Sequence, residues 1–286
     1  MAVDRILACD LGGTRMRVAI VGMGGSVGDK EVISTPGDDP DALVRIMSSV
    51  LSKAVGRTAG VVVGVPGLVD YSRGQVLKLP NLPAWDGHVS APHLSKALGL
   101  TVLLANDADL AALGEHRFGA GRGSQDMVYM TSSTGVGGGV ILNGRLLHGK
   151  LSLAEIGHTI IDKSKGGTLE SLGSGTALGR LAGESAALVS ERAARGDEKA
   201  RKQFDQVARD FAIGVHNVVH CFSPEVVVIG GGMSKSGDML LDPVRRMLEE
   251  FGPFRPASNV RVVQAAGGDD VGLKGAAAFW ADYQKE

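Results

Sequence analysis

A short run of hydroxyl and glycine residues lies between two apolar segments near the middle of the chain. Residues 132–135, Ser-Ser-Thr-Gly, follow the apolar segment 127–131 and precede a glycine triplet and a second apolar segment, 140–142. Glycine lets the backbone approach a ligand closely, and successive N–H groups in such a turn form a concave anion site. Glu155 and His158 follow as a polar cluster. The pattern predicts a phosphate-binding turn beside a polar pocket, and an ordinary glycine-rich hairpin remains open.

The N-terminal region repeats this pattern. The apolar segment 6–10 ends in Asp10, a Gly-Gly-Thr turn occupies residues 12–14, and the apolar segment 16–21 returns. Both regions therefore have the order strand, glycine-containing turn, strand. We infer that the chain contains two similar halves and that phosphates bind between them.

Helices and strands alternate along the chain. Segments with strand character are 6–10, 16–21, 31–35, 60–65, 101–105, 127–131, 140–142 and 226–229. Apolar residues at helical spacing predict helices over 40–56, 91–98, 110–118, 176–194, 197–222 and 273–283. Several strands are entirely apolar, which is typical of strands covered on both faces. The alternation predicts an α/β protein with parallel pairing in its sheets.

The composition is that of a globular protein of about two domains. A formal net charge of -1 gives no electrostatic reason to expect nucleic acid or an anionic membrane as partner. No apolar run reaches the roughly 18 residues of a membrane span, and the first ten residues lack the apolar core of a signal peptide. Cys9 and Cys221 lie in apolar runs and are predicted to be buried thiols. We expect a cytoplasmic protein.

Four motifs, taken together, resemble those of one family. Asp10–Thr14, Asn106–Ala108, Ser133–Gly139 and Glu155–His158 occur in the order seen in the ROK family of sugar kinases. The resemblance covers nearly the whole chain. It implies an α/β, two-domain, actin-like or hexokinase-type ATPase fold (ribonuclease H-like), with a nucleotide and sugar cleft between the domains.

The domain boundary is expected close to Asp107, before a new pair of strands begins. The N-terminal α/β domain would comprise residues 1–107, joined by the C-terminal helix 272–286. The C-terminal α/β domain would comprise residues 108–271.

By this resemblance, Asp107 is the general base that accepts the proton of the sugar hydroxyl. The alternative is an N-cap aspartate for the following helix, but Asp109 is better placed for that cap. Asp10 ends a buried strand, where an unpaired carboxylate is costly. A magnesium ion held by Asp10 through water would explain it, because Mg²⁺ commonly keeps several waters.

The resemblance also implies two groups of ligand-binding residues. Those for ATP and its phosphates are Asp10, Gly12, Gly13, Thr14, Thr134, Gly135, Gly230, Gly231 and Gly232. Those for the sugar are Asn81, Asn106, Asp107, Glu155, His158 and Glu170. The glycines 230–232 could equally form a plain strand-to-helix turn. Trp85 is expected to pack at the edge of its domain rather than against the sugar.

The chain departs from the family in one loop. Family members commonly bind structural zinc with the histidine of the Glu-Ile-Gly-His motif and three cysteines, and residues 160–172 contain no cysteine. A closed zinc site needs about four ligands, and only His158 is present, so we predict no structural zinc. The change also alters the loop that places Glu170. Ala154, where the family usually has glycine, could displace Glu155.

The favoured function is ATP- and Mg²⁺-dependent phosphorylation of a hexose, most simply glucose, at its 6-hydroxyl. Alternatives are another acceptor (an N-acylmannosamine, fructose or allose) or polyphosphate as donor. A non-catalytic sugar sensor is an alternative of another class and is disfavoured by Asp107. A sugar-responsive repressor is disfavoured by the near-zero net charge and by a first strand that starts within a few residues of Met1. The family also suggests a homodimer or homotetramer. The near-zero net charge and the lack of a membrane-spanning apolar run predict no nucleic acid and no membrane as partner.

Overall fold

The computed structural model describes residues 4–152, 154–164, 166–251 and 259–285. The chain forms two compact units. Unit 1 comprises Met1–Gly119, His148–Ser152 and Gly267–Glu286, and unit 2 comprises Ala120–Leu147 and Leu153–Ala266. The chain therefore passes between the units more than once.

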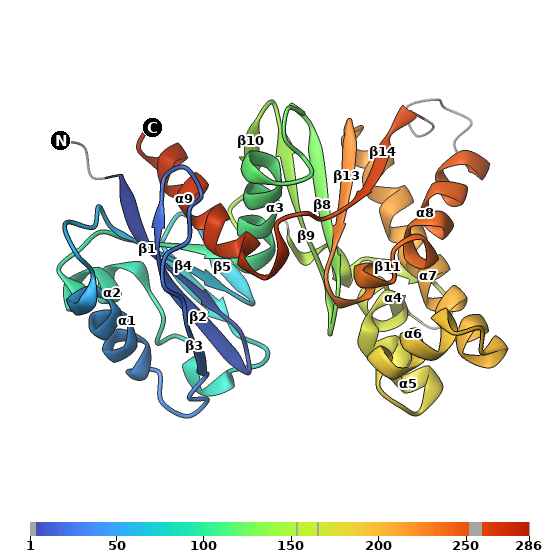
Figure 1. The fold of residues 1–286 in the computed structure, drawn as a ribbon, viewed down its shortest axis with the longest axis horizontal. Coiled ribbons are helices and arrows are strands. Elements are labelled where there is room, and N and C mark those ends of the chain that lie inside the picture. Colours follow the sequence, from blue (N-terminus) through green and yellow to red (C-terminus); the bar gives the residue numbers. More distant parts are fainter. Residues whose placement is uncertain (1–3, 153, 165, 252–258, 286) are drawn as a thin grey trace. The chain divides into compact units, whose positions relative to one another are not determined.

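Unit 1 is built on a five-stranded sheet with the order β3-β2-β1-β4-β7 (Figure 1). The strands are β1 (Arg5–Leu11), β2 (Arg15–Gly22), β3 (Glu31–Ser34), β4 (Val61–Val65) and β7 (Val102–Asn106). Strands β1, β4 and β7 are parallel, and β2 and β3 pair antiparallel. The carboxyl ends of the three parallel strands consequently share one edge of the sheet, which carries Asp10 and Asn106. A small separate sheet pairs β5 (Leu68–Asp70) with β6 (Gln75–Lys78).

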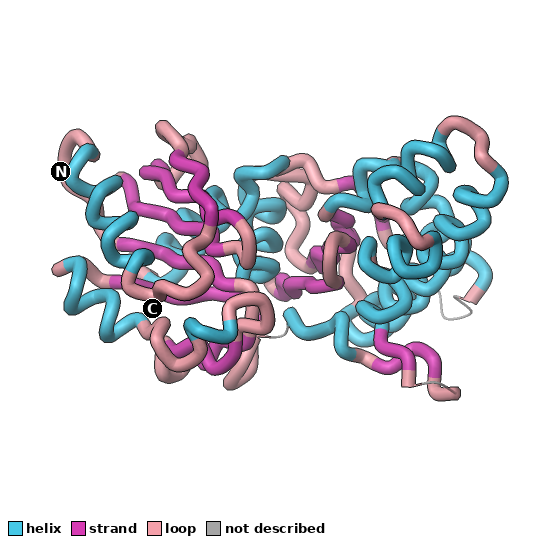
Figure 2. Tube along the Cα trace, turned by 90° about the horizontal axis from the view of Figure 1, so that it is seen from below, coloured by secondary structure: helices cyan, strands magenta, loops and turns pink. Residues whose placement is uncertain are grey.

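Helices cover both faces of this sheet (Figures 1 and 2). Their bounds are α1 (Ala42–Lys53), η1 (Pro83–Trp85), α2 (Ala91–Leu98), α3 (Asp107–Phe118), η5 (Gly268–Asp270) and α9 (Val271–Tyr283). Alternate residues of β1 join different cores: Leu7 packs in the cluster that contains Leu43 of α1, and Ile6 in the cluster that contains Trp280 of α9. The period-two alternation of a strand thus gives the unit a core on each face.

Helices α3 and α9 approach each other at the level of their backbones. A Cβ on Gly275 would lie 1.8 Å from the carbonyl oxygen of Leu110, and one on Gly114 would lie 2.2 Å from that of Val271. Only glycine permits this approach. Helix α3 therefore belongs to unit 1, and the chain leaves this unit after Gly119, whereas the sequence suggested a boundary just before the helix.

Unit 2 repeats the sheet of unit 1, with the order β10-β9-β8-β13-β14. The strands are β8 (Met127–Ser132), β9 (Val136–Leu142), β10 (Arg145–Leu147), β13 (Val226–Gly230) and β14 (Arg261–Gln264). Strands β8, β13 and β14 are parallel, and β9 and β10 pair antiparallel. The prediction of two similar halves is confirmed in the strand order. Both sheets are mixed rather than wholly parallel, because each begins with an antiparallel hairpin.

The remaining elements of unit 2 are short segments and helices, with the long helix α7 against the sheet. Their bounds are η2 (Ala154–His158), β11 (Ile160–Asp162), β12 (Gly167–Thr168), α4 (Leu169–Gly173), α5 (Gly175–Ala182), α6 (Ala186–Ala194), α7 (Glu198–Phe222), η3 (Gly232–Ser236) and α8 (Asp238–Glu250). Phe204 and Phe211 of α7 are fully buried in one core with Met130 and Ile229 of the sheet. The predicted apolar stripe of this helix therefore faces the core.

Several predictions from the sequence differ in detail from the structure. Glycines 137–139 lie within β9 and not in the turn. The helix expected over 176–194 is two helices, because Gly183 has a left-handed conformation that ends α5. Helix α8 and strand β14 were not predicted. Cys221 is exposed, and its predicted burial is wrong. Trp85 is fully buried, which confirms its packing role.

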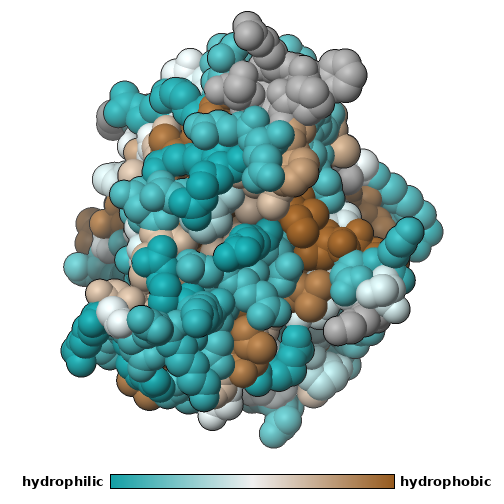
Figure 3. Space-filling view, turned by 90° about the vertical axis from the view of Figure 1, so that its right-hand side faces the viewer, coloured by the Kyte–Doolittle hydropathy of each residue, from teal (hydrophilic) through white to brown (hydrophobic). Residues whose placement is uncertain are grey.

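None of the helices among the described residues is both long and apolar enough to cross a membrane. The face seen in Figure 3 is mainly hydrophilic, with limited apolar areas.

Candidate active site

Asp107 lies where the chain passes from β7 into α3, at the carboxyl edge of the parallel strands of unit 1. Its Oδ1 accepts a hydrogen bond of 2.9 Å from the N–H of Ala108. Burial, with smaller contributions from the charges of Asp10 and Asp109, raises the pKa of Asp107 to about 7. A carboxylate with a pKa near the working pH is well suited to accept a proton from a hydroxyl.

Asn106, and not Asp109, is the N-cap of α3. Its Oδ1 accepts hydrogen bonds from the N–H groups of Ala108 at 2.8 Å and Asp109 at 3.4 Å. Its Nδ2 donates to the carbonyl oxygen of Gly67 at 2.9 Å. The prediction that Asp109 caps the helix is therefore wrong, because the preceding asparagine already occupies that role. Of the four hydrogen bonds that an asparagine side chain can make, these contacts leave one N–H for a ligand such as a sugar hydroxyl.

Asp10 lies directly across the β1–β2 pair from Arg17. Its Oδ2 accepts a hydrogen bond of 3.1 Å from Arg17 Nη1, and burial raises the pKa of Asp10 in spite of this cation. A Cβ on Gly272, in the first turn of α9, would lie 3.7 Å from the Asp10 carboxyl carbon. Among the described residues no three His, Cys, Asp or Glu side chains form a metal-binding group. The second oxygen of Asp10 suits a water-mediated contact with Mg²⁺, which keeps most of its waters.

The turn after β1 lies against Asn81. The N–H of Gly12 donates to the carbonyl oxygen of Arg15 at 3.0 Å, and Thr35 Oγ1 donates to the carbonyl oxygen of Gly12 at 2.7 Å. A Cβ on Gly13 would lie only 2.6 Å from Cβ of Asn81. Unit 1 therefore brings a predicted sugar ligand into contact with a predicted phosphate turn.

In unit 2 the two predicted glycine turns lie side by side. Gly231 has φ +85°, and a Cβ there would lie 2.4 Å from the carbonyl oxygen of Ser132. The carbonyl oxygen of Thr134 accepts a hydrogen bond of 2.6 Å from Thr176 Oγ1 at the start of α5. The turn after β13 and the turn between β8 and β9 are thus packed together.

A cavity of about 1060 Å³ opens beside these turns, within unit 2. Thr134 and Gly232 line it, together with residues of α5, α6, η3 and α8. Its walls combine glycine, alanine and methionine with serine and threonine, and its charged side chains are Arg180, Glu191, Arg201 and Lys235. Ligand pockets of this size and mainly apolar lining hold drug-sized organic molecules.

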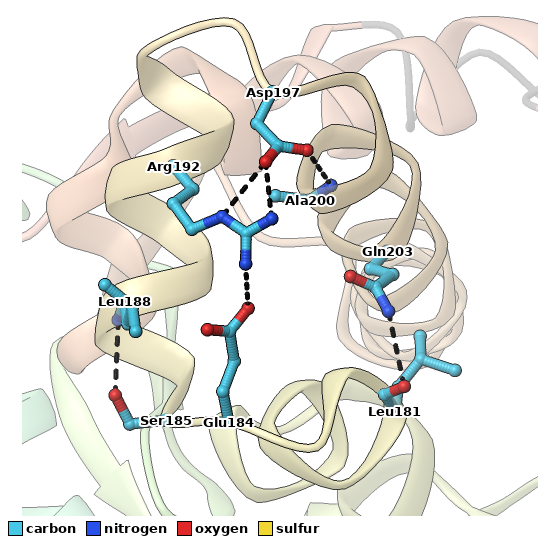
Figure 4. A network of polar contacts seen from close by, with 8 residues as sticks. All are labelled: Leu181, Glu184, Ser185, Leu188, Arg192, Asp197, Ala200 and Gln203. Carbon is cyan, nitrogen blue, oxygen red and sulfur yellow. Dashed lines mark hydrogen bonds and ion pairs between the residues drawn. The ribbon is translucent and has the colours of Figure 1, made fainter.

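A network of ion pairs fixes the wall of this cavity (Figure 4). Arg192 of α6 donates from Nη1 to Glu184 at 2.6 Å and from Nε to Asp197 at 3.0 Å. These two carboxylates, Asp197 foremost, raise the pKa of Arg192. Asp197 also accepts a hydrogen bond of 3.0 Å from the N–H of Ala200 as the N-cap of α7. The network ties α6 to the beginning of the long core helix.

The structure brings Glu155, His158 and Glu170 together around the first residue of β9. His158 Nε2 lies 3.2 Å from Glu155 Oε2. Glu170 Oε2 accepts a hydrogen bond of 3.0 Å from the N–H of Val136. A Cβ on Gly157, between Glu155 and His158, would lie 2.1 Å from the carbonyl oxygen of Val136. The three predicted sugar ligands of unit 2 therefore share one neighbourhood beside the β8–β9 turn.

The absence of structural zinc stays a prediction. The segment that lacks cysteine forms the short β11–β12 pair and leads into α4. We expect protein purified without added metal or chelator to contain far less than one zinc ion per chain, because His158 alone cannot complete a tetrahedral site. Metal analysis by mass spectrometry checks this, and stoichiometric zinc would contradict it.

The sequence did not point to the walls of the cavity. Helices α5 and α6 line much of it, but they carry no motif with an obvious chemical role. The available signal was the run of small residues Gly173, Gly175 and Gly179. A Cβ on Gly175 would lie 2.7 Å from the carbonyl oxygen of Ser133, so this glycine is needed for the close approach of α5 to the turn.

Comparison with known proteins gives a consistent result. The ROK family matches residues 6–283. A glucokinase from Thermotoga maritima is 33% identical over 306 residues, with 96% of each chain covered. The structure of a ROK hexokinase from Thermus thermophilus aligns with a TM-score of 0.85 at 31% identity, covering 99% of this chain and 100% of that one. A ROK family glucokinase from Streptomyces griseus, solved in complex with glucose and AMPPNP, aligns with a TM-score of 0.82 at 30% identity. The alignment covers 96% of this chain and 98% of that one. The chain thus belongs to the ROK family and has its hexokinase-type fold.

Proposed function

We propose that this protein is a carbohydrate kinase that uses ATP to phosphorylate the 6-hydroxyl of a hexose, most simply glucose. The observation that carries the proposal is Asp107, a half-buried carboxylate with a pKa of about 7 at the carboxyl edge of the parallel strands. Phosphoryl transfer needs a residue that accepts the proton of the attacking hydroxyl. The glucokinase relatives of similar length support glucose as the acceptor.

In this proposal unit 1 supplies the base and part of the phosphate contacts. Asp107 takes the proton of the 6-hydroxyl as the oxygen attacks the γ-phosphate, and Asn81 and Asn106 bind sugar hydroxyls. The turn of Gly12, Gly13 and Thr14 would bind phosphate through the N–H groups of Gly13 and Thr14, because the N–H of Gly12 already donates to the carbonyl oxygen of Arg15. Asp10 would hold Mg²⁺ through water. When bound, the metal neutralises the charge that develops on the phosphates.

Unit 2 supplies the nucleotide pocket and the other sugar ligands. The large cavity lies against Thr134 and Gly232, so a nucleotide could place its adenosine between α5, α6 and η3 and its phosphates at the turns. Alanine and methionine in the walls suit the adenosine of ATP, whereas Arg180, Arg201 and Lys235 could bind the phosphates of either ATP or polyphosphate. Glu155 and Glu170 would accept hydrogen bonds from sugar hydroxyls, and His158 could donate one. Sugar hydroxyls need partners of both kinds.

The direct test is ADP release from Mg-ATP in the presence of single sugars. The panel contains glucose, fructose, allose, N-acetylmannosamine and a second N-acylmannosamine. Each sugar is also tried with polyphosphate as donor, and there the readout is the sugar phosphate, because this donor forms no ADP. We expect the highest kcat/KM with glucose and ATP. A strong preference for another sugar would change the proposed acceptor, and no activity with any sugar and either donor would favour a sugar sensor.

A cytoplasmic location and a homodimer or homotetramer remain part of the proposal.

The pH dependence of kcat/KM for the sugar should report the base. Asp107 must be deprotonated to accept a proton, and its pKa is raised to about 7 by burial and by Asp10 and Asp109. We therefore expect kcat/KM to rise with pH through about 7 and then to level off. A profile that stays flat down to pH 5 would contradict this assignment. The measurement uses sugar well below its KM, so that it follows the free enzyme.

A further inference from the structure

A closed ring of hydrogen bonds surrounds the backbone of Asp107 in unit 1. The N–H of Asn106 donates to the hydroxyl oxygen of Tyr71 at 3.2 Å, and that hydroxyl donates to Asp109 Oδ2 at 2.7 Å. The N–H of Asp109 then donates back to Asn106 Oδ1 at 3.4 Å. Asp107 lies in the chain between Asn106 and Asp109, the two residues that this ring joins. The ring therefore holds the peptides on both sides of the residue.

A second hydroxyl reaches the same carboxylate from a distant part of the sequence. Ser152 Oγ donates to Asp109 Oδ2 at 2.7 Å, and both residues are buried. Ser152 belongs to His148–Ser152, the short segment that unit 1 receives from the middle of the chain. Leu151 of this segment also forms a β-bridge with Asp70, the residue before Tyr71. The segment is thus bound to the same small group of residues.

The ring of Tyr71 is fixed by packing, so its hydroxyl has a defined position. Its centroid lies 4.6 Å from that of His148 and 6.2 Å from that of Phe279 in α9. Burial, together with the charge of Asp109, raises the pKa of Tyr71 above its usual value, which keeps the hydroxyl protonated as a donor. Phenylalanine would satisfy the packing equally well. The hydroxyl is needed only for the hydrogen-bond ring.

We propose that Tyr71, Asp109 and Ser152 are positioning residues for Asp107. They hold the β7–α3 junction so that the carboxylate of Asp107 lies within hydrogen-bonding distance of the sugar hydroxyl. This inference rests on the kinase function proposed above. A base must be held within a fraction of an ångström of its productive position, and a misplacement of about 1 Å can cost about 100-fold in rate. The three residues act through the backbone and not by touching the substrate.

The test compares Tyr71→Phe and Ser152→Ala with a matched control, Ser95→Ala. Ser95 Oγ accepts a hydrogen bond of 2.9 Å from the N–H of Val102, at the opposite end of β7 from Asn106. Tyr71→Phe and Ser95→Ala therefore each remove one side-chain acceptor from a backbone N–H of the same strand. Each variant is assayed well below its melting temperature, and kcat is expressed per folded protein.

We expect Tyr71→Phe and Ser152→Ala each to lower kcat about tenfold while the KM for ATP changes less than about twofold. In the double variant, kcat should fall by a smaller factor than the product of the two single-variant factors, because both hydroxyls act on Asp109 Oδ2. Ser95→Ala should lose a similar amount of thermal stability and keep its kcat.

Two results would overturn the inference while leaving the kinase function intact. In the first, the wild type is active and Tyr71→Phe has the same kcat as the wild type. In the second, Ser95→Ala loses as much kcat as Tyr71→Phe, which would indicate general destabilisation. A wild type that phosphorylates no sugar would overturn the function and the inference with it.

Discussion

Replacing Asp107 with asparagine is expected to lower kcat by about 10²- to 10⁴-fold, the range that a general base contributes. Asparagine has nearly the same shape and can accept the hydrogen bond from the N–H of Ala108 that Asp107 Oδ1 accepts. It cannot take a proton from a hydroxyl at neutral pH. Sugar binding, measured by calorimetry in the absence of ATP, should remain largely intact. Substantial turnover by the variant would contradict the role of Asp107.

The same variant should be more stable than the wild type above neutral pH. The pKa of Asp107 is raised to about 7 in the folded protein, mainly by burial, from an ordinary value of 3.8. The protonated carboxyl therefore favours folding, and this contribution is lost as pH rises through about 7. Asparagine carries no charge to bury, so the Asp107→Asn variant should melt at a higher temperature at pH 8. An equal or lower melting temperature would indicate that the carboxylate is not strained by its environment.

Replacing Gly275 with alanine is expected to destabilise unit 1 by about 3 kcal/mol, as overpacking against fixed backbone does. The added Cβ would lie 1.8 Å from the carbonyl oxygen of Leu110, so α9 must move away from α3. Because α3 begins with Asp107, kcat should fall as well. Both tryptophans, Trp85 and Trp280, are buried in unit 1. Urea unfolding followed by tryptophan fluorescence therefore reports this unit.

Gly272→Ala is the matched control in the same helix. A Cβ there would lie 3.7 Å from its nearest neighbour, the Asp10 carboxyl carbon, which is an ordinary van der Waals distance. Alanine favours a helix over glycine by up to about 1 kcal/mol, so this variant should unfold at the same or a higher urea concentration. Equal destabilisation by both substitutions would show that the close approach of α3 and α9 is not what requires Gly275.

The sequence predicted much of the fold because local patterns and tertiary structure agree. The two strand–turn–strand patterns correspond to β1–β2 and β8–β9, and the strand orders of both sheets repeat as expected. The buried strands β4 and β13 are uniformly apolar, so their burial on both faces could be inferred. The edge strand β14 has only four residues and a partly polar pattern, which leaves too little signal for a prediction.

The site was predictable only where motifs carry it. Asp10, Asp107 and the glycine turns lie at strand ends, where the sequence placed them. The pairing of Asp10 with Arg17 and the raised pKa values of Asp10 and Asp107 depend on the register and burial of the sheet. Tyr71 and Ser152 are far apart in the sequence and have no motif. Only the fold shows that both donate to Asp109. Asn106 could have been recognised as the N-cap, because asparagine is among the preferred residues at that position.

The most direct test of the account is the identification of the product formed from glucose and Mg-ATP. Wild-type protein is incubated with both, and the products are followed by phosphorus nuclear magnetic resonance alongside ADP release. We predict glucose 6-phosphate in equal amount to ADP, with little ADP formed when glucose is omitted. ADP released at the same rate with and without sugar, or no sugar phosphate with glucose or any other hexose of the panel, would contradict the proposed function.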